Sequence, residues 1–296
     1  MNKEVVVQEP TAKRHAAATP RPAEIVAAIE AQSLVRTTPC GDGHMVWHQW
    51  GSGRTVVLFH GGHGSWTHWL RNIEALSARY RVLAADLPGL GDSATPPLPH
   101  TPDTLSNIVA GGLRTLLAPG EQADIVGFSF GGMLGGHTAM KLGPQIRSLT
   151  LVGAGGMGLP LRARPDMRGW RDVPDPARRE AIHRHNLGVL MFADAAKIDA
   201  LAVHLQTTNT VRGRMNSRRL SGMGTLPGVL PQLRAPLCGI WGEFDFSARG
   251  RLELYAERLN SMQAGAPMMT IRGAGHWVQF EAAEEFNRIL LEALEK

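Results

Sequence analysis

The stretch "DIVGFSFGGMLGG", residues Asp124 to Gly136, decides which fold the sequence predicts. An apolar, strand-like run ends at Gly127, and a serine at 129 is followed by Gly131 and a helical pattern. A Gly-x-Ser-x-Gly motif between a strand and a helix is typical of a nucleophilic serine held on a sharp turn. Glycines are needed there because two backbones approach closely. The alternative is a structural glycine turn that contains a serine, so the rest of the chain has to decide.

Strand-like and helix-like segments alternate on both sides of this motif. A continuous β-branched run such as "RTVVLFH", residues 54–60, is typical of a buried parallel strand. Strands that alternate with helices predict a mostly parallel, doubly wound α/β sheet with helices on both faces. Two earlier segments, 33–38 and 44–50, predict an antiparallel pair joined by a turn. The further predicted strands lie within 80–89, 123–128, 146–153, 235–245 and 267–277.

The alternation is interrupted once, between about residues 156 and 231. This interval carries helical patterns at 176–192 and 194–215, with prolines at its edges. We therefore predict a flexible N-terminal tail (1–22), an α/β core (23–155 and 232–296), and a helical cap inserted at 156–231.

Three residues that can act together in nucleophilic catalysis each follow a predicted strand. Ligands of open α/β sheets bind beyond the carboxyl ends of the strands, and there the chain places Ser129, Asp245 and His276. A serine needs a base within hydrogen-bond reach, itself oriented by an acid. Asp86 also ends a strand, but we expect it to brace a loop. Asp124 precedes its strand and lies at the opposite edge.

The chain resembles the α/β-hydrolase superfamily over about residues 33–294. "HGG" at 60–62 resembles the oxyanion-loop motif of that family, "DLPGLGDS" at 86–93 its Asp-x-x-Gly-x-Gly-x-Ser stretch, and "WGEFD" at 241–245 its acid-bearing strand. The chain order Ser…Asp…His is also that of the family. The resemblance implies that the backbone N–H groups of Gly62 and Phe130 stabilise an oxyanion, within one residue's uncertainty along Gly61 to His63.

Within the superfamily, "GAGHWVQFEAAEEFNRILLEAL" (273–294) is most similar to the carbon–carbon hydrolases that cleave ring-fission products, the meta-cleavage-product hydrolases, and to related carboxylesterases. The chain departs from the former in carrying Phe128 before the nucleophile, where they carry Asn. Their cap arginine aligns near His204, with Arg212 about two turns further on. The candidate substrate-binding residues are Phe128, Trp277, His204, Arg212 and Arg184.

The net charge of +5 at pH 7 raises the question of nucleic-acid binding. Residues 157–234 hold twelve Arg and one Lys against six acids, but only two aromatic residues that could stack on bases. We therefore expect no nucleic acid and favour a small-molecule substrate, anionic where a cap arginine faces the pocket.

Several other classes are disfavoured. Cys40 and Cys238 match no zinc or redox spacing and are expected to be reduced thiols. No apolar run reaches the roughly 18–20 residues of a membrane span, and the start of the chain lacks a secretory apolar stretch. We expect a cytoplasmic enzyme without cofactor, metal or membrane partner, and leave a homo-oligomer open. His60, His63 and His68 lie across a glycine loop without a carboxylate or cysteine, so no metal is expected.

The sequence thus predicts a serine hydrolase that acts through an acyl-enzyme. Carboxylic-ester hydrolysis is the leading reaction, and hydrolytic carbon–carbon cleavage of a 2-hydroxy-6-oxo-dienoate type of product is the alternative. A catalytically inactive, ligand-binding member of the same fold is a third reading.

Overall fold

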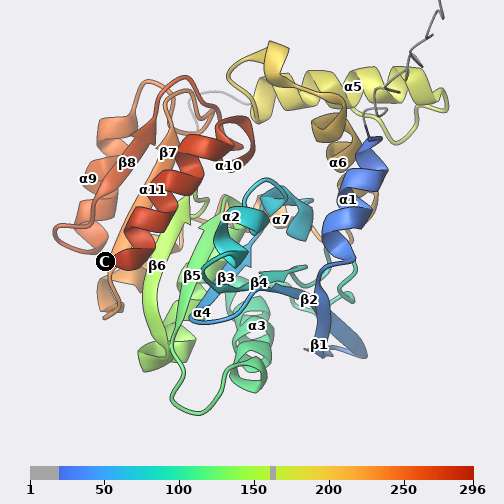
Figure 1. Cartoon of the computed structure of the whole chain (residues 1–296). Helices are drawn as coiled ribbons and strands as arrows, with labels where there is room; N and C mark the ends of the chain where they lie inside the picture. Colours follow the sequence, from blue (N-terminus) through green and yellow to red (C-terminus); the bar gives the residue numbers. More distant parts are fainter. Residues whose placement is uncertain (1–19, 161–164) are drawn as a thin grey trace, which may run out of the picture.

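A computed structural model describes residues 20–160 and 165–296, and one eight-stranded sheet runs through this part of the chain (Figure 1). The strand order is β1-β2-β4-β3-β5-β6-β7-β8. β1 pairs antiparallel with β2, and β2 antiparallel with β4, while all other neighbours are parallel. The strands are β1 Leu34–Cys40, β2 Gly43–Trp50, β3 Thr55–Phe59, β4 Arg81–Ala85, β5 Ala123–Phe128, β6 Ile146–Val152, β7 Leu237–Gly242 and β8 Met268–Ile271. The predicted mostly parallel sheet and its antiparallel start are confirmed.

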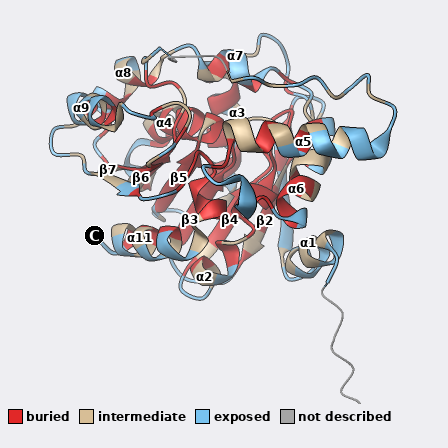
Figure 2. Ribbon diagram, turned by 90° about the horizontal axis from the view of Figure 1, so that it is seen from above, coloured by how far each residue is buried: buried red, intermediate tan, exposed pale blue. Residues whose placement is uncertain are grey.

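Helices cover both faces of the sheet because the central strands are apolar on both sides. Along β3, Val57 and Phe59 join one hydrophobic core, and Val56 and Leu58 join the other. The first core includes side chains of α3, α4 and α9, and the second includes those of α2 and α11. The buried residues form a central band between these layers in Figure 2. The helices of the core are α1 Pro22–Glu30, α2 Ile73–Ser77, α3 Pro102–Leu116, α4 Phe130–Leu142, α9 Leu252–Met262, α10 Val278–Glu281 and α11 Ala283–Glu295.

The interval between β6 and β7 is helical. It contains α5 Pro176–Leu190, α6 Ala200–Val211, α7 Ser217–Ser221 and α8 Leu226–Val229. Figure 1 shows α5 crossing above the sheet, while α7 and α8 contact α4. The sequence predicted one helix over 194–215, but α6 occupies only its middle. Asp199 caps α6 by accepting a hydrogen bond from the backbone of Ala202, so the helix cannot begin earlier.

The N-terminal prediction is tested only in part. Residues 1–19 of the predicted tail lie outside the described residues, as do 161–164 of the inserted interval. Pro22, the last residue of the predicted tail, is the first residue of α1. Proline suits that position because its missing N–H would have no partner in the first helical turn.

Candidate active site

Ser129 lies on the sharp turn between β5 and α4 that the sequence predicted. Its backbone has φ +53° and ψ −114°, a left-handed φ that a residue with a side chain rarely adopts. The flanking glycines explain how the turn is built. A Cβ on Gly127 would lie 2.5 Å from the carbonyl oxygen of Gly131, and one on Gly131 would lie 2.4 Å from that of Phe59. Only residues without a side chain allow the two backbones to come this close.

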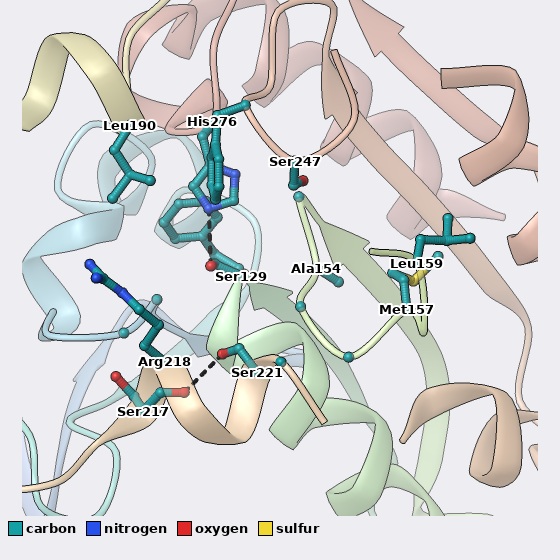
Figure 3. A pocket seen from close by; sticks show the side chains of 18 of the residues that line it. Ser129, Ala154, Met157, Leu159, Leu190, Ser217, Arg218, Ser221, Ser247 and His276 are labelled. Carbon is teal, nitrogen blue, oxygen red and sulfur yellow. Dashed lines mark hydrogen bonds between the residues drawn. The ribbon is translucent and has the colours of Figure 1, made fainter. Parts of the chain in front are cut away.

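A chain of two hydrogen bonds joins Ser129 to His276 and Asp245. The Oγ of Ser129 is 3.0 Å from Nε2 of His276, whose Nδ1 is 2.8 Å from Oδ2 of Asp245. Because an ionised carboxylate only accepts hydrogen bonds, Nδ1 carries the proton, and Nε2 is left to accept from the Ser129 hydroxyl. The structure therefore brings the three predicted residues together in the order that nucleophilic catalysis needs (Figure 3 shows Ser129 and His276).

Asp245 is fully buried but has enough partners to stay ionised. Its Oδ1 accepts hydrogen bonds from the backbone N–H of Ser247 at 2.9 Å and from the Ser247 hydroxyl at 2.7 Å. Burial raises the pKa of Asp245, yet the charge and hydrogen bond of His276 and the two bonds from Ser247 outweigh it. The net result is a pKa below the ordinary value. The carboxylate can therefore orient the imidazole and stabilise it when it gains a proton.

Two backbone N–H groups beside Ser129 have no acceptor within the described residues, those of Gly62 and Phe130. Phe130 is the first residue of α4, so its N–H has no partner within the helix. The N–H of Gly61 instead donates to Nδ1 of His68 at 3.2 Å. Of the three residues that the sequence left open, Gly61 is thereby engaged elsewhere, and Gly62 has a free donor.

The histidine loop is tied to the inserted helices by one carboxylate. Glu281 accepts hydrogen bonds from the backbone N–H of Gly275 at 2.6 Å, of Asp194 at 2.9 Å, and of Ala193 at 3.0 and 3.1 Å. Gly275 directly precedes His276, and Ala193 and Asp194 follow α5. The end of α5 and the position of the imidazole are thus linked through Glu281.

Ser129 and His276 open into a cavity of about 620 Å³. Figure 3 shows Met157 and Leu159 on one side of Ser129, and Ser217, Arg218 and Ser221 of α7 on another. The cavity is lined by four groups of residues: the loop after β3 (Gly61, Gly62, His63), the segment after β6 (Gly153–Pro160), the inserted helices (Leu190, Met191, Ser217, Arg218, Ser221–Gly224), and side chains from the core (His68, Phe128, Phe246, Ser247, Tyr255).

Of the five predicted substrate-binding residues, the structure places only Phe128 in the cavity wall. Its buried ring lies 5.0 Å from that of His276. Trp277 is a core residue instead: its ring stacks on Phe280 at 4.2 Å, and its N–H donates to the carbonyl of His68.

The three residues predicted from the inserted interval also lie away from the cavity lining. Arg184 is exposed and donates to the carbonyl of Ile198, and Arg212 forms a 2.8 Å ion pair with Asp92. His204 lies on α6 and lines no part of the cavity. These arginines face away because a carbonyl and a carboxylate satisfy them elsewhere.

The other strand-end acid, Asp86, braces a loop. Its Oδ1 accepts from the backbone of Trp66 and its Oδ2 from that of Asp92, at 2.8 and 2.7 Å. Burial raises its pKa to about 7, and the two N–H donors offset part of that rise. Asp124 lies at the opposite edge of the sheet, where it pairs with Arg54 and Arg147.

The loop histidines do not assemble a metal site. Burial lowers the pKa of His60 to about 4, and its Nε2 accepts from the backbone N–H of Leu87. Within residues 20–160 and 165–296, no three His, Cys, Asp or Glu side chains are grouped to hold a metal ion. Cys40 and Cys238 are free thiols.

Sequence reasoning missed the side chains that α7 contributes to the cavity. Arg218 and Ser217 line it. They were missed because the stretch "NSRRLSG" is too short to show a helical periodicity that would predict which residue faces inward. The signal available was the N-cap: Asn216 accepts from the backbone of Arg219. Asparagine before a short polar run indicates a helix start, but not its orientation.

The comparisons with known proteins identify the family to which the chain belongs. Residues 56–289 match the family model described as the alpha/beta hydrolase family, so the chain belongs to that family and has its fold. The chain is 27% identical over 258 residues to the 2-hydroxy-6-oxononadienedioate/2-hydroxy-6-oxononatrienedioate hydrolase of Escherichia coli (strain K12), covering 81% of this chain and 86% of that one. It is 29% identical over 262 residues to the dihydrolipoyllysine-residue acetyltransferase component of the acetoin cleaving system of Pseudomonas putida, covering 82% of this chain and 64% of that relative's length.

Solved structures are similar at the level of the fold. A thermophilic esterase from Thermogutta terrifontis superimposes with a TM-score of 0.65 at 22% identity, covering 89% of this chain and 98% of that one. The chain is thus an α/β hydrolase by its family, and the esterase shares its fold. No helix in the described part of the chain has the length and apolar character needed to cross a membrane.

Proposed function

We propose that this α/β hydrolase is a serine hydrolase whose nucleophile is Ser129, and that it cleaves carboxylic esters of small molecules. The observation that carries the proposal is the pair of hydrogen bonds from Ser129 to His276 and from His276 to Asp245, at 3.0 and 2.8 Å, beside the cavity. A serine on a strained turn, with its base oriented by a buried acid, is the arrangement that activates a hydroxyl.

In the proposed reaction, Oγ of Ser129 attacks the carbonyl carbon while Nε2 of His276 takes the hydroxyl proton. The N–H groups of Gly62 and Phe130 stabilise the negative oxygen; removing one such donor from a serine protease of another fold costs about 2.7–4 kcal/mol. The ester C–O bond breaks, and the alcohol leaves with the proton from His276. Water then adds to the acyl-enzyme with His276 as base, the bond to Oγ breaks, and Ser129 regains its proton.

We further propose that residues 156–231 act as a cap over this site. The support is that α5 and α7 supply Leu190, Ser217 and Arg218 to the cavity wall, while Glu281 fixes the end of α5 against the His276 loop. Substrate selection would then depend on side chains that the core itself does not provide.

Carbon–carbon cleavage is the second candidate, because the Escherichia coli relative is by its name a hydrolase of 2-hydroxy-6-oxo-dienedioates. Phe128 favours the ester reading, since its buried ring offers no hydrogen bond to an oxygen-rich substrate. Comparing kcat/KM for short 4-nitrophenyl esters with that for a 2-hydroxy-6-oxo-dienoate separates the two. A larger value for the dienoate would replace the first candidate with the second.

The nucleophile is tested by Ser129→Ala. We expect a folded protein whose turnover is lower by about three orders of magnitude or more and which a fluorophosphonate probe no longer labels. Ser221→Ala is the matched control, because Ser221 presents a second hydroxyl to the same cavity. A Ser129→Ala variant that kept a tenth of wild-type kcat would place the nucleophile elsewhere. A wild-type protein that binds esters but is never labelled would favour the inactive, ligand-binding reading.

A further inference from the structure

The cavity is positively charged on one wall and has no acid in its lining. No Asp or Glu lies among the described residues that line it, while Arg218, His63, His68 and His276 do. A cavity without anionic groups but with a guanidinium offers an anion a partner that nothing in the wall already neutralises. The first question is therefore where Arg218 lies relative to Ser129.

Arg218 extends from α7 along the cavity, on the side where Leu190 approaches from α5 (Figure 3). Its side chain is exposed, and it forms no ion pair or hydrogen bond with any residue in 20–160 or 165–296. Arg212, one of the two arginines that the sequence predicted to face the pocket, is instead paired with Asp92. Arg218 is thus a cation in the cavity wall that remains available to a ligand.

His63 adds a second polar group to this wall. Its backbone has φ +53°, a strained value for a residue with a side chain, and its Nδ1 is buried without a partner in the described residues. Burial lowers the pKa of His63, and the positive charges of Arg218 and Arg171 lower it further. The imidazole is therefore neutral, and a bound anion would offset the positive charge that Arg218 and Arg171 place around it.

Ser217 lies between this wall and the loop that holds Gly62. Ser217 is fully buried, and its hydroxyl has no hydrogen-bond partner among the described residues. The hydroxyl oxygen lies 2.6 Å from the point where a Cβ on Gly62 would stand. The polar wall is consequently continuous with the oxyanion donor that we propose for Gly62, so an anion there would be near the reacting carbonyl.

The opposite side of Ser129 is apolar. Met157 and Leu159 line it in Figure 3, and Phe246 lines the cavity next to the acid-bearing loop, with its ring 4.9 Å from that of His276. Ser129 therefore stands between a wall with a free cation and a wall of apolar side chains. A ligand that spans the cavity has to present different chemistry to each.

We propose that Arg218 and His63 form a carboxylate-binding subsite, and that the substrates are esters with a carboxylate on one side of the reacting carbonyl and an apolar group on the other. This inference rests on the serine hydrolase function proposed above and adds the substrate class. The charge-assisted hydrogen bond from Arg218 should raise kcat/KM for the charged ester roughly tenfold over its neutral counterpart.

The test compares 4-nitrophenyl hydrogen adipate with 4-nitrophenyl methyl adipate, which release the same chromophore and differ by one negative charge. We expect the wild-type protein to prefer the acid at least tenfold in kcat/KM. Arg218→Met should bring that preference close to one. Arg219→Met is the matched control: Arg219 is the adjacent exposed arginine of α7 but does not line the cavity, so the preference should be unchanged.

A second pair of esters reverses the orientation: 4-carboxyphenyl hexanoate and its methyl ester place the charge on the alcohol. A preference for the acid in either pair that only Arg218→Met abolishes supports the subsite and shows which side it binds. Equal rates for acid and methyl ester in both pairs, or equal loss in the Arg218 and Arg219 variants, would overturn it. Equal loss would mean long-range attraction, which 0.5 M NaCl should also remove.

Binding to a protein that cannot turn over separates this inference from the proposed function. In the Ser129→Ala background, calorimetric titration with 4-nitrophenyl hydrogen adipate should give a Kd at least ten times lower than in Ser129→Ala with Arg218→Met. Tight binding without turnover by the wild type would refute ester hydrolysis and leave the subsite standing. Ester turnover by the wild type, together with equal Kd values in the two variants, would support ester hydrolysis and refute the subsite.

Discussion

Gly131→Ala should unfold at a lower denaturant concentration than the matched control Gly111→Ala, although alanine is the better helix former at both positions. The added Cβ would stand 2.4 Å from the carbonyl oxygen of Phe59 and 2.5 Å from that of His60, where real Cβ contacts do not fall below 3.0 Å. Both obstacles are backbone atoms, one at the end of β3 and one in the loop that follows it, so no side chain can rotate to make room.

The magnitude follows from two opposing effects. Overpacking a rigid site costs about 1–3 kcal/mol, while Gly to Ala in a helix gains about 1 kcal/mol. Gly111→Ala isolates the gain, because Gly111 lies within α3 with nothing within 4 Å of its added Cβ. We expect Gly111→Ala to raise the free energy of unfolding by about 1 kcal/mol and Gly131→Ala to lie about 1–3 kcal/mol below that control.

The same substitution should reduce activity, because Phe59 and His60 directly precede the Gly61–Gly62 turn. A misplacement of about 1 Å in an active site can cost on the order of a hundredfold in rate. Urea unfolding and the rate of fluorophosphonate labelling measure the two effects. If Gly131→Ala unfolded together with Gly111→Ala and was labelled at the wild-type rate, the close backbone approach deduced for this turn would be wrong.

Three further substitutions test the acids. Asp245→Asn should lower kcat by about 10⁴-fold, as the loss of an orienting carboxylate does in other triads, while Asp86→Asn should keep kcat within tenfold. Between its ordinary pKa and about 7, folded Asp86 keeps a proton that the unfolded chain has lost, so it lowers the stability by up to about 1.4 kcal/mol per pH unit as pH rises. In urea unfolding, the stability of Asp86→Asn relative to wild type should therefore increase from pH 5 to pH 8. A difference in unfolding free energy that does not change with pH would contradict the raised pKa. Glu281→Gln should cost about 1.5–3 kcal/mol, against no measurable change for exposed Glu284→Gln; equal unfolding midpoints would mean that the carboxylate does not hold α5 to the histidine loop.

Much of the fold could be predicted because the central strands are apolar on both faces. The apolar runs that form β3 and β5 are typical of buried parallel strands. Parallel strands bring their carboxyl ends to one edge of the sheet. Position after a strand was therefore enough to place Ser129, Asp245 and His276 within hydrogen-bond distance. No comparable rule exists for the inserted helices, which have no fixed relation to the sheet.

The cavity wall shows where sequence reasoning ends. Arg184 and Arg212 lie on longer helical patterns and were predicted to face the pocket, but Ile198 and Asp92 hold them elsewhere. Arg218 lies on a helix of five residues, too short for a periodic pattern to indicate its inner face. Trp277 follows the histidine directly, yet its ring is buried against Phe280 and does not line the cavity. Such choices depend on partners far away in the chain.

The two unlike walls around Ser129 also bear on how products leave. A substrate that spans the cavity binds through both ends at once, so the contributions of the two walls reinforce each other as in a chelate. Breaking the bond between the two ends separates them, and each fragment keeps only one attachment. Each product would then bind more weakly than the substrate. Accumulated product should therefore compete poorly with substrate for the cavity between Arg218 and Met157.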